Sequence, residues 1–230
     1  MFQFQITTQK VLRAITIGTK STMIIGALLA FYQGRFLMAT EILIILSITF
    51  LPLALGKQFQ LKIPHEFEIL AIIFVYASLF LGEVHDYYIV YWWWDVVLHT
   101  GSGLLLGIIG FLLVYVLNEK DDINLDLTAG FMGLFAFVFA VALGTVWEIF
   151  EFIMDSVFSL NMQKPMFNDP SGLTDTMCDL IVDALGAGII SVLGYGYFRT
   201  VERDSFLEQW IDKFIHENPQ LFNQTKNNQN

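Results

Sequence analysis

Six long apolar segments recur along this chain, and they limit its fold more than any other feature does. About 20 mostly apolar residues in a helix are enough to cross the hydrocarbon core of a bilayer. Backbone groups inside lipid have no water to bond with, and a helix satisfies them internally. The sequence therefore predicts an all-α, polytopic transmembrane helical bundle of about six spans. The expected spans cover roughly residues 15–33, 37–55, 67–82, 96–117, 128–152 and 178–198.

The composition supports a membrane domain. Hydrophobic residues make up 55% of the 230 residues and charged residues 15%, whereas soluble domains carry about a quarter charged residues. We expect a single transmembrane helical domain over residues 1–198. We expect the tail, 199–230, to carry an amphipathic helix at 204–216 and then a disordered end.

Lysine and arginine are distributed unevenly between the expected loops. With the N-terminus inside, ten of the twelve fall on the cytoplasmic side, and Arg35 and Lys164 fall outside. Basic residues concentrate on the cytoplasmic side of membrane proteins. Both termini are therefore expected to be cytoplasmic. The first span contains Lys20, so it crosses the bilayer only if that side chain reaches toward the interface.

Seven ionisable residues stand out because they fall at the edge of, or inside, the apolar segments. They occur at helical spacing in three stretches: Asp95 and His99; Glu148 and Glu151; Asp175, Asp179 and Asp183. Moving such groups into hydrocarbon costs at least a few kcal/mol, so they are usually paired, coordinated or lining a wet cavity. The search for function therefore starts with these residues.

Helix rise predicts that these residues form two layers. At about 1.5 Å per residue, His99, Glu148 and Asp179 lie about 27 to 30 Å from the cytoplasmic ends of their helices. That distance is the full thickness of the hydrocarbon core, which places this layer at the outer boundary. Asp183 lies one turn deeper. The second layer, one turn further out, consists of Asp95, Glu151 and Asp175.

Glycines accompany the acids on the last three spans. Small residues let transmembrane helices approach closely. We therefore expect these three helices to bring their acid-bearing faces together. The glycines concerned are Gly101, Gly103, Gly107, Gly130, Gly133, Gly144, Gly186 and Gly188.

Few basic residues are available as counterions for the clustered carboxylates. These groups cannot all be ionised together unless a cation neutralises them or they share protons. Oxygen ligands with one imidazole suit Mg²⁺, Mn²⁺, Fe²⁺ or Zn²⁺. The predicted ligands of a divalent metal ion are Asp95, His99, Glu148, Asp175 and Asp179.

The remaining site residues receive supporting or catalytic roles. Glu151 is expected to act as a general base, with Glu148 as the second catalytic carboxylate. Asp183 and Asp155 are expected to support the ligands or to relay protons. Structural roles stay open as alternatives, and Asp175 in particular suits a helix N-cap.

The order of three motifs resembles the YjdF-like family of bacterial inner-membrane proteins. The motifs are D-x-x-x-H from Asp95, W-E-I-x-E from Trp147, and D-T-x-x-D-x-x-x-D-x-x-G-A from Asp175. The resemblance covers about residues 80–195 and implies a multi-pass protein of the bacterial cytoplasmic membrane, but it implies no reaction. More distantly, the chain looks like VanZ-like proteins, although Glu151 stands where that pattern has glutamine.

Three functions stay open at this point. The leading hypothesis is a metal-dependent hydrolase that acts at the outer leaflet on a lipid or lipid-linked envelope substrate. The second is a cation- or proton-coupled transporter with Asp183 as the inward step of a relay. The third is a non-enzymatic membrane protein with a structural cation. Membrane lipid is the expected partner, and no nucleic acid is expected.

Overall fold

The computed structural model describes residues 8–58, 60–118, 127–164, 166, 169–199 and 213–219. Within these ranges the chain forms helices and no β-strands, which confirms the all-α prediction. The chain divides into two compact units, Met1–Tyr91 and Trp92–Asn230. Six helical stretches are long and apolar enough to cross a membrane, and they are Lys10–Tyr32, Phe36–Gln58, His65–Val84, Trp94–Asn118, Ala129–Phe158 and Leu173–Gly196.

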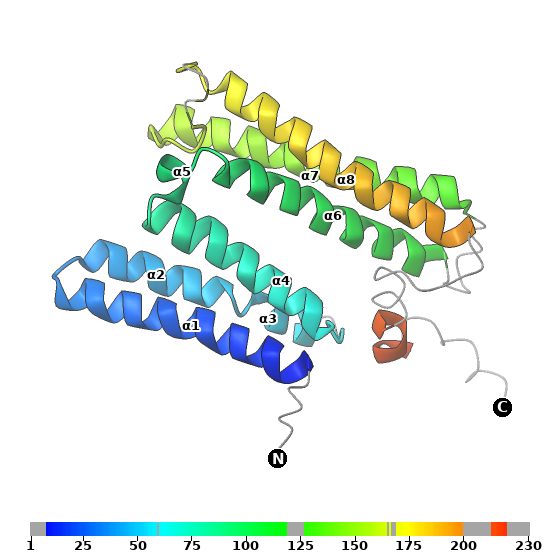
Figure 1. Ribbon diagram of the computed structural model, residues 1–230, viewed down its shortest axis with the longest axis horizontal. Helices are drawn as coiled ribbons and strands as arrows, with labels where there is room; N and C mark the ends of the chain where they lie inside the picture. The colour runs from blue at the N-terminus through cyan, green and yellow to red at the C-terminus, as the bar shows by residue number, and fades with distance from the viewer. Residues whose placement is uncertain are drawn as a thin grey trace, which may run out of the picture. The chain divides into compact units, whose positions relative to one another are not determined.

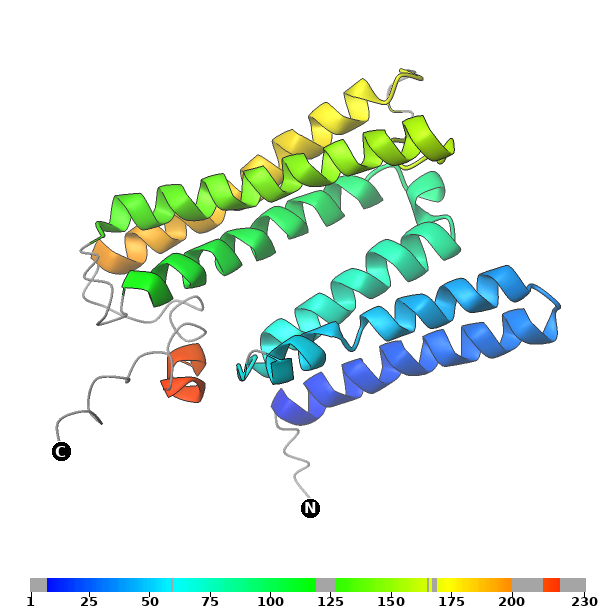
Figure 2. The same ribbon diagram turned by 180° about the vertical axis from the view of Figure 1, so that it is seen from behind.

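The first unit holds the first three of these stretches (Figures 1 and 2). Its elements are α1 (Thr8–Tyr32), α2 (Phe36–Ile48), α3 (Leu51–Gln58), α4 (His65–Val75), the π-helix η1 (Tyr76–Val84) and α5 (Tyr87–Val90). Helices α1 and α2 run antiparallel and pack against each other. Apolar side chains from α1, α2 and η1 form the core: Met23, Ala27, Ala30, Ala39, Ile42, Ile45, Phe80 and Val84.

Lys20 does not interrupt the first helix. Its ammonium nitrogen lies 3.9 Å from the centroid of the Phe50 ring. Attraction between a cation and the face of an aromatic ring offsets part of the cost of placing the charge among apolar side chains. The second span, in contrast, is two helices rather than one. Pro52 lacks the N–H that would bond to the Ile48 carbonyl, so α2 ends at Ile48 and α3 begins at Leu51.

The second unit is built on three long helices that pack pairwise against one another, α6 (Trp94–Asn118), α7 (Ala129–Phe158) and α8 (Leu173–Arg199). They lie side by side in both views, with α7 antiparallel to α6 and α8 (Figures 1 and 2). The start of α6, the end of α7 and the start of α8 therefore share one end of the bundle. The seven ionisable residues singled out in the sequence lie in these segments.

Two helix ends differ from the sequence expectation. Helix α7 continues to Phe158 instead of ending near residue 152, and α8 begins at Leu173 instead of 178. In the sequence, the ends of these two spans were placed where the apolar runs reach acidic residues. In the structure Glu151 and Asp175 are buried, so the helices continue past the end of the apolar pattern.

Close approach of the three helices depends on particular glycines. A Cβ atom on Gly103 would collide with the backbone carbonyl of Asp183, and one on Gly186 would collide with the carbonyl of Thr100. These contacts confirm the expected tight packing of α6 on α8. Gly101 differs, because a Cβ atom there would have no other atom within 4 Å.

Several sequence expectations stay predictions. The cytoplasmic location of both termini and the single membrane domain are not decided by the helix arrangement. In the tail, residues 213–217 are helical, and the amphipathic helix expected at 204–216 stays a prediction. The rest of that helix, 204–212, and the end after residue 219 lie outside the described residues.

We predict that Gly186→Ala destabilises the protein and that Gly101→Ala does not. The new methyl group at position 186 meets backbone atoms of α6, and such overpacking costs about 1 to 3 kcal/mol. At position 101 it meets open space, and alanine is a better helix former than glycine. Thermal unfolding in detergent micelles measures both effects. Equal midpoints for the two variants would contradict the packing argument.

Candidate metal centre

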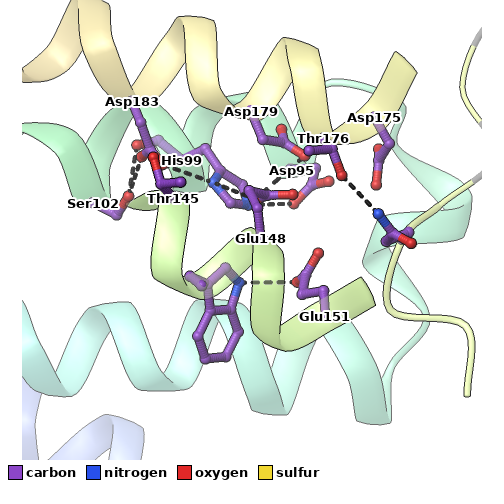
Figure 3. Close-up of polar contacts among 12 residues, drawn as sticks. Asp95, His99, Ser102, Thr145, Glu148, Glu151, Asp175, Thr176, Asp179 and Asp183 are labelled. Atoms are coloured by element: carbon purple, nitrogen blue, oxygen red, sulfur yellow. Dashed lines mark hydrogen bonds and ion pairs between the residues drawn. The ribbon is translucent and has the colours of Figure 1, made fainter. Parts of the chain in front are cut away.

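The acidic and histidine side chains converge because of their helical spacing. Asp175, Asp179 and Asp183 recur every four residues, so they share one face of α8, and Asp95 and His99 share a face of α6 in the same way. Figure 3 shows the three α8 carboxylates in a row, with Glu148 pointing toward them from α7.

His99 lies at the centre of four carboxylates. Its Nε2 atom is 3.6 Å from Asp95 Oδ1 and 3.9 Å from Asp179 Oδ2. On the other side of the ring, Nδ1 is 3.4 Å from Asp183 Oδ2 and 3.9 Å from Glu148 Oε1. The imidazole therefore joins acids from all three helices of the bundle (Figure 3).

Asp183 is wedged between the helices behind His99. Its Oδ1 accepts a hydrogen bond from the hydroxyl of Ser102, and its Oδ2 is the partner of His99 Nδ1. Gly144 leaves the space for this carboxylate, because a Cβ atom there would collide with Oδ2. A neutral imidazole that donates its Nδ1 hydrogen to Asp183 turns the lone pair of Nε2 toward Asp95 and Asp179.

Three buried carboxylates have oxygens without a hydrogen-bond partner among the described residues. They are both oxygens of Glu148, both oxygens of Asp179, and Oδ1 of Asp175. The residues are 2%, 0% and 1% exposed. Buried charges are normally paired, hydrogen-bonded or bound to a metal, because an unpaired buried charge is very costly. A bound cation or shared protons would satisfy these oxygens together with His99, which lies 3.9 Å from Glu148 Oε1 and from Asp179 Oδ2.

The Nε2 side of His99 faces two candidate metal ligands, Asp95 and Asp179. One ligand atom each from Asp95, His99 and Asp179 lie within 4.8 Å of one another. A Zn²⁺ ion binds nitrogen and oxygen ligands at about 2.0 to 2.2 Å, so its ligand atoms lie at most about 4.4 Å apart, slightly closer than this limit. These three residues could hold a metal ion.

The outer acids are held in different ways. Glu151 Oε1 accepts a hydrogen bond of 2.9 Å from the indole Nε1 of Trp147. Asp175 Oδ2 accepts one of 2.6 Å from the backbone N–H of Lys164. Each carboxylate is thus oriented by a neighbouring donor. Trp147 lies four residues before Glu151, so helical spacing suggested that contact only indirectly. The spacing did not indicate the contact between Lys164 and Asp175.

Asp155 is engaged with the connection between α7 and α8. Its two oxygens accept the backbone N–H groups of Met162 and Gln163, at 2.8 and 2.9 Å. The structure therefore places this carboxylate against the loop that connects the two helices. The same loop is tied to α8 by Gln163 Nε2, which donates to the Thr176 hydroxyl at 2.7 Å.

Asp169, rather than Asp175, fastens the start of α8. Its oxygens accept hydrogen bonds from the backbone N–H and hydroxyl groups of both Ser171 and Thr174. These hydrogen bonds hold the pKa of Asp169 well below its usual range, and the bond from the Ser171 hydroxyl contributes most. Asp175 lies inside the first turn of α8, where its carboxylate faces the bundle.

Sequence reasoning did not identify Ser102, Gln163 or Asp169. Ser102 lies three residues after His99, so its helical spacing was a usable signal. The Asp-Pro-Ser-Gly-Leu-Thr run from Asp169 is typical of a helix start with short-range caps. Gln163 carried no comparable signal, because its role depends on how the loop folds back on α8.

Comparison with known proteins agrees with the membrane fold. A family described as "Predicted membrane protein (DUF2238)" matches residues 14–200, which include all three acid-bearing helices. The chain belongs to this family. It is also similar to an uncharacterized protein of Thermotoga maritima, with 29% identity over 146 residues that cover 64% of this chain and 70% of that protein. No solved structure matches the chain. The YjdF-like and VanZ-like resemblances stay predictions.

We predict that Asp169→Ala speeds amide hydrogen exchange at Ser171 and Thr174 while exchange in α6 stays unchanged. Ionised Asp169 accepts four hydrogen bonds from these two residues, and alanine removes them. Because its folded pKa is lowered, its stabilising effect is present above about pH 4 and is lost as pH falls through the folded value. The difference between wild type and variant should therefore be constant between about pH 5 and 8. Equal exchange in the two proteins would contradict this role.

Proposed function

We propose that this multi-pass membrane protein is a divalent-metal-dependent hydrolase whose substrate is a membrane lipid or a lipid-linked envelope molecule. The observation that carries the proposal is the set of buried carboxylate oxygens around His99 that have no hydrogen-bond partner among the described residues. A cation is the simplest partner that satisfies them together. Asp95, His99 and Asp179 are the proposed ligands of this ion.

The charge balance supports a cation. The carboxylates of Asp95, Glu148, Glu151, Asp175, Asp179 and Asp183 share this end of the bundle with His99 (Figure 3). Even a protonated imidazole would offset only one of their charges. A donor set of carboxylate oxygens and one imidazole nitrogen suits Mn²⁺, Fe²⁺, Zn²⁺ or Mg²⁺.

Glu151 is the proposed general base. A bound divalent ion would lower the pKa of a coordinated water and would polarise the bond to be cleaved. Glu151 lies one helical turn from Glu148, and the Trp147 indole holds its Oε1 in place. Its Oε2 is then the atom that takes a proton from water.

The surroundings of the cluster support a lipid substrate. On α7, apolar side chains next to Glu148 and Glu151 are exposed, among them Trp147, Ile149 and Phe150. Exposed apolar residues on a membrane helix face the lipid. A substrate held in the membrane would therefore meet α7 beside these buried acids. The acids lie at one end of their helices, which we assign to the outer leaflet from the distribution of basic residues.

We predict that the purified protein contains a divalent metal and that His99→Ala contains much less of it. Elemental analysis of wild type, His99→Ala and the control Glu41→Gln, an exposed acid on α2, measures this directly. Turnover of phospholipids and polyprenyl phosphates is then assayed after reloading with each metal. Wild type and Glu41→Gln should hydrolyse one of these substrates, and His99→Ala should not.

The outcomes of that experiment separate the candidate functions. Absence of both metal and turnover in wild type would overturn the proposal. Bound metal without turnover on any substrate would instead support the non-enzymatic role, in which the cation ties α6, α7 and α8 together. Metal-dependent ion flux in proteoliposomes would support the transporter.

We predict that Asp183→Asn weakens metal binding about 10- to 100-fold, the usual effect of removing a group that orients a histidine ligand. An amide cannot accept from both Ser102 and His99 as the carboxylate does, and it lacks the charge. Titration with Mn²⁺ measures the affinity. Ser191→Ala is the matched control, because Ser191 lies on the same helix but its hydroxyl donates to the Gly133 carbonyl at 2.8 Å. Equal affinity in wild type and Asp183→Asn would show that Asp183 does not position the ligand.

A further inference from the structure

Lys164 lies beside the acid cluster and carries the only basic side chain of its region. The sequence has no other lysine, arginine or histidine between residues 121 and 198, a stretch that includes α7, the loop after it and nearly all of α8. The backbone N–H of Lys164 donates to Asp175 Oδ2 at 2.6 Å. Asp175 lies one helical turn from Asp179, a proposed metal ligand. The loop therefore holds its one cation next to the candidate metal centre.

The loop around Lys164 is fastened by hydrogen bonds. Asp155 accepts the backbone N–H groups of Met162 and Gln163 at 2.8 and 2.9 Å. The ammonium of Lys164 donates to the carbonyl of Asn161 at 2.6 Å, and this contact is exposed. An ammonium has three N–H donors, so it can bind this carbonyl and an anionic oxygen at the same time.

The end of α7 is long enough to reach the lipid headgroups. Helix α7 has 30 residues, which gives it a length of about 45 Å. A bilayer is about 40 to 45 Å thick when its headgroup layers are included. At this end of the helix Val157, Phe158 and Leu160 are 65%, 62% and 48% exposed. Exposed apolar side chains with a lysine beside them are typical of segments that bind anionic lipid at the membrane interface.

We propose that Lys164 binds the phosphate group of a membrane lipid whose apolar part packs against Val157, Phe158 and Leu160. The ammonium of lysine is a point charge that suits a phosphate. The carboxylates around His99 repel an anionic lipid, and Lys164 offsets that repulsion where the headgroup approaches. This inference rests on the proposed function for its consequence, which is that the hydrolysed substrate is a phosphate-bearing lipid rather than a neutral one.

Lipid binding tests this proposal separately from catalysis. The full-length protein in dodecyl maltoside micelles is titrated with a fluorescent phosphatidic acid and with the matching diacylglycerol, which lacks the phosphate, and fluorescence anisotropy gives both affinities. Wild type should prefer phosphatidic acid. Lys164→Gln should bind phosphatidic acid about fivefold more weakly, the contribution of one lysine near an anionic lipid surface, and should bind diacylglycerol as before.

Two further variants control for the fold and for general charge. Glutamine at position 164 keeps the backbone N–H that donates to Asp175, and Lys164→Arg, which keeps the charge, should bind as wild type does. Lys57→Gln removes an exposed lysine at the end of α3 and should also bind as wild type does. Equal affinity for phosphatidic acid in wild type and Lys164→Gln, or equal weakening in Lys57→Gln, would overturn the assignment of Lys164.

The remaining outcomes separate this inference from the proposed function. If inorganic phosphate at the same concentration displaced phosphatidic acid, the apolar surface would play no part and the lipid assignment would be wrong. Metal-dependent hydrolysis of diacylglycerol but not of phosphatidic acid would overturn this inference and leave the hydrolase standing. Binding of phosphatidic acid through Lys164, without turnover of any lipid, would support the phosphate site and overturn the hydrolase.

Discussion

The burial of several carboxylates around a single imidazole, inside a bundle of membrane helices, is the constraint on which the rest of this structure depends. Groups of this kind are stable in such a place only when another charge or a set of hydrogen bonds compensates them. Asp183 meets that condition through Ser102 and His99. Glu148 and Asp179 have His99 as a neighbour but no hydrogen bond to their oxygens from the described residues, and the proposed cation would account for that difference.

Helix packing and charge depend on each other in this bundle. Gly103 and Gly186 let the backbones of α6 and α8 touch, and Gly144 leaves room on α7 for the Asp183 carboxylate. Without these contacts the acids of the three helices could not reach one imidazole. Conversely, the close approach would gather uncompensated negative charge if no cation were bound. A structural cation and a catalytic one would both satisfy this balance, so activity has to be measured separately from binding.

The fold and the general place of the site could be predicted from periodicity and hydropathy. Helical spacing along α6 and α8 placed Asp95 with His99, and Asp179 with Asp183. The helix ends were harder, because Glu151 and Asp175 carry the polarity of loop residues while being buried in helices. The roles of Asp155 and Asp169 could not be separated in advance either. Both acids bind loop groups, and only the path of the loop determines which groups are in reach.

By itself, the sequence determined that the chain forms membrane-spanning helices, because long apolar runs have no other stable conformation in lipid. It also determined which faces of three helices carry acids, because the spacing of residues along a helix sets their direction. The tertiary structure decided that His99 lies among four of those acids and that Asp183 stands behind it. It also decided which carboxylate oxygens have no hydrogen-bond partner in the part of the chain that the structure describes. These features depend on the rotation and the separation of packed helices, which follow from contacts between distant parts of the chain.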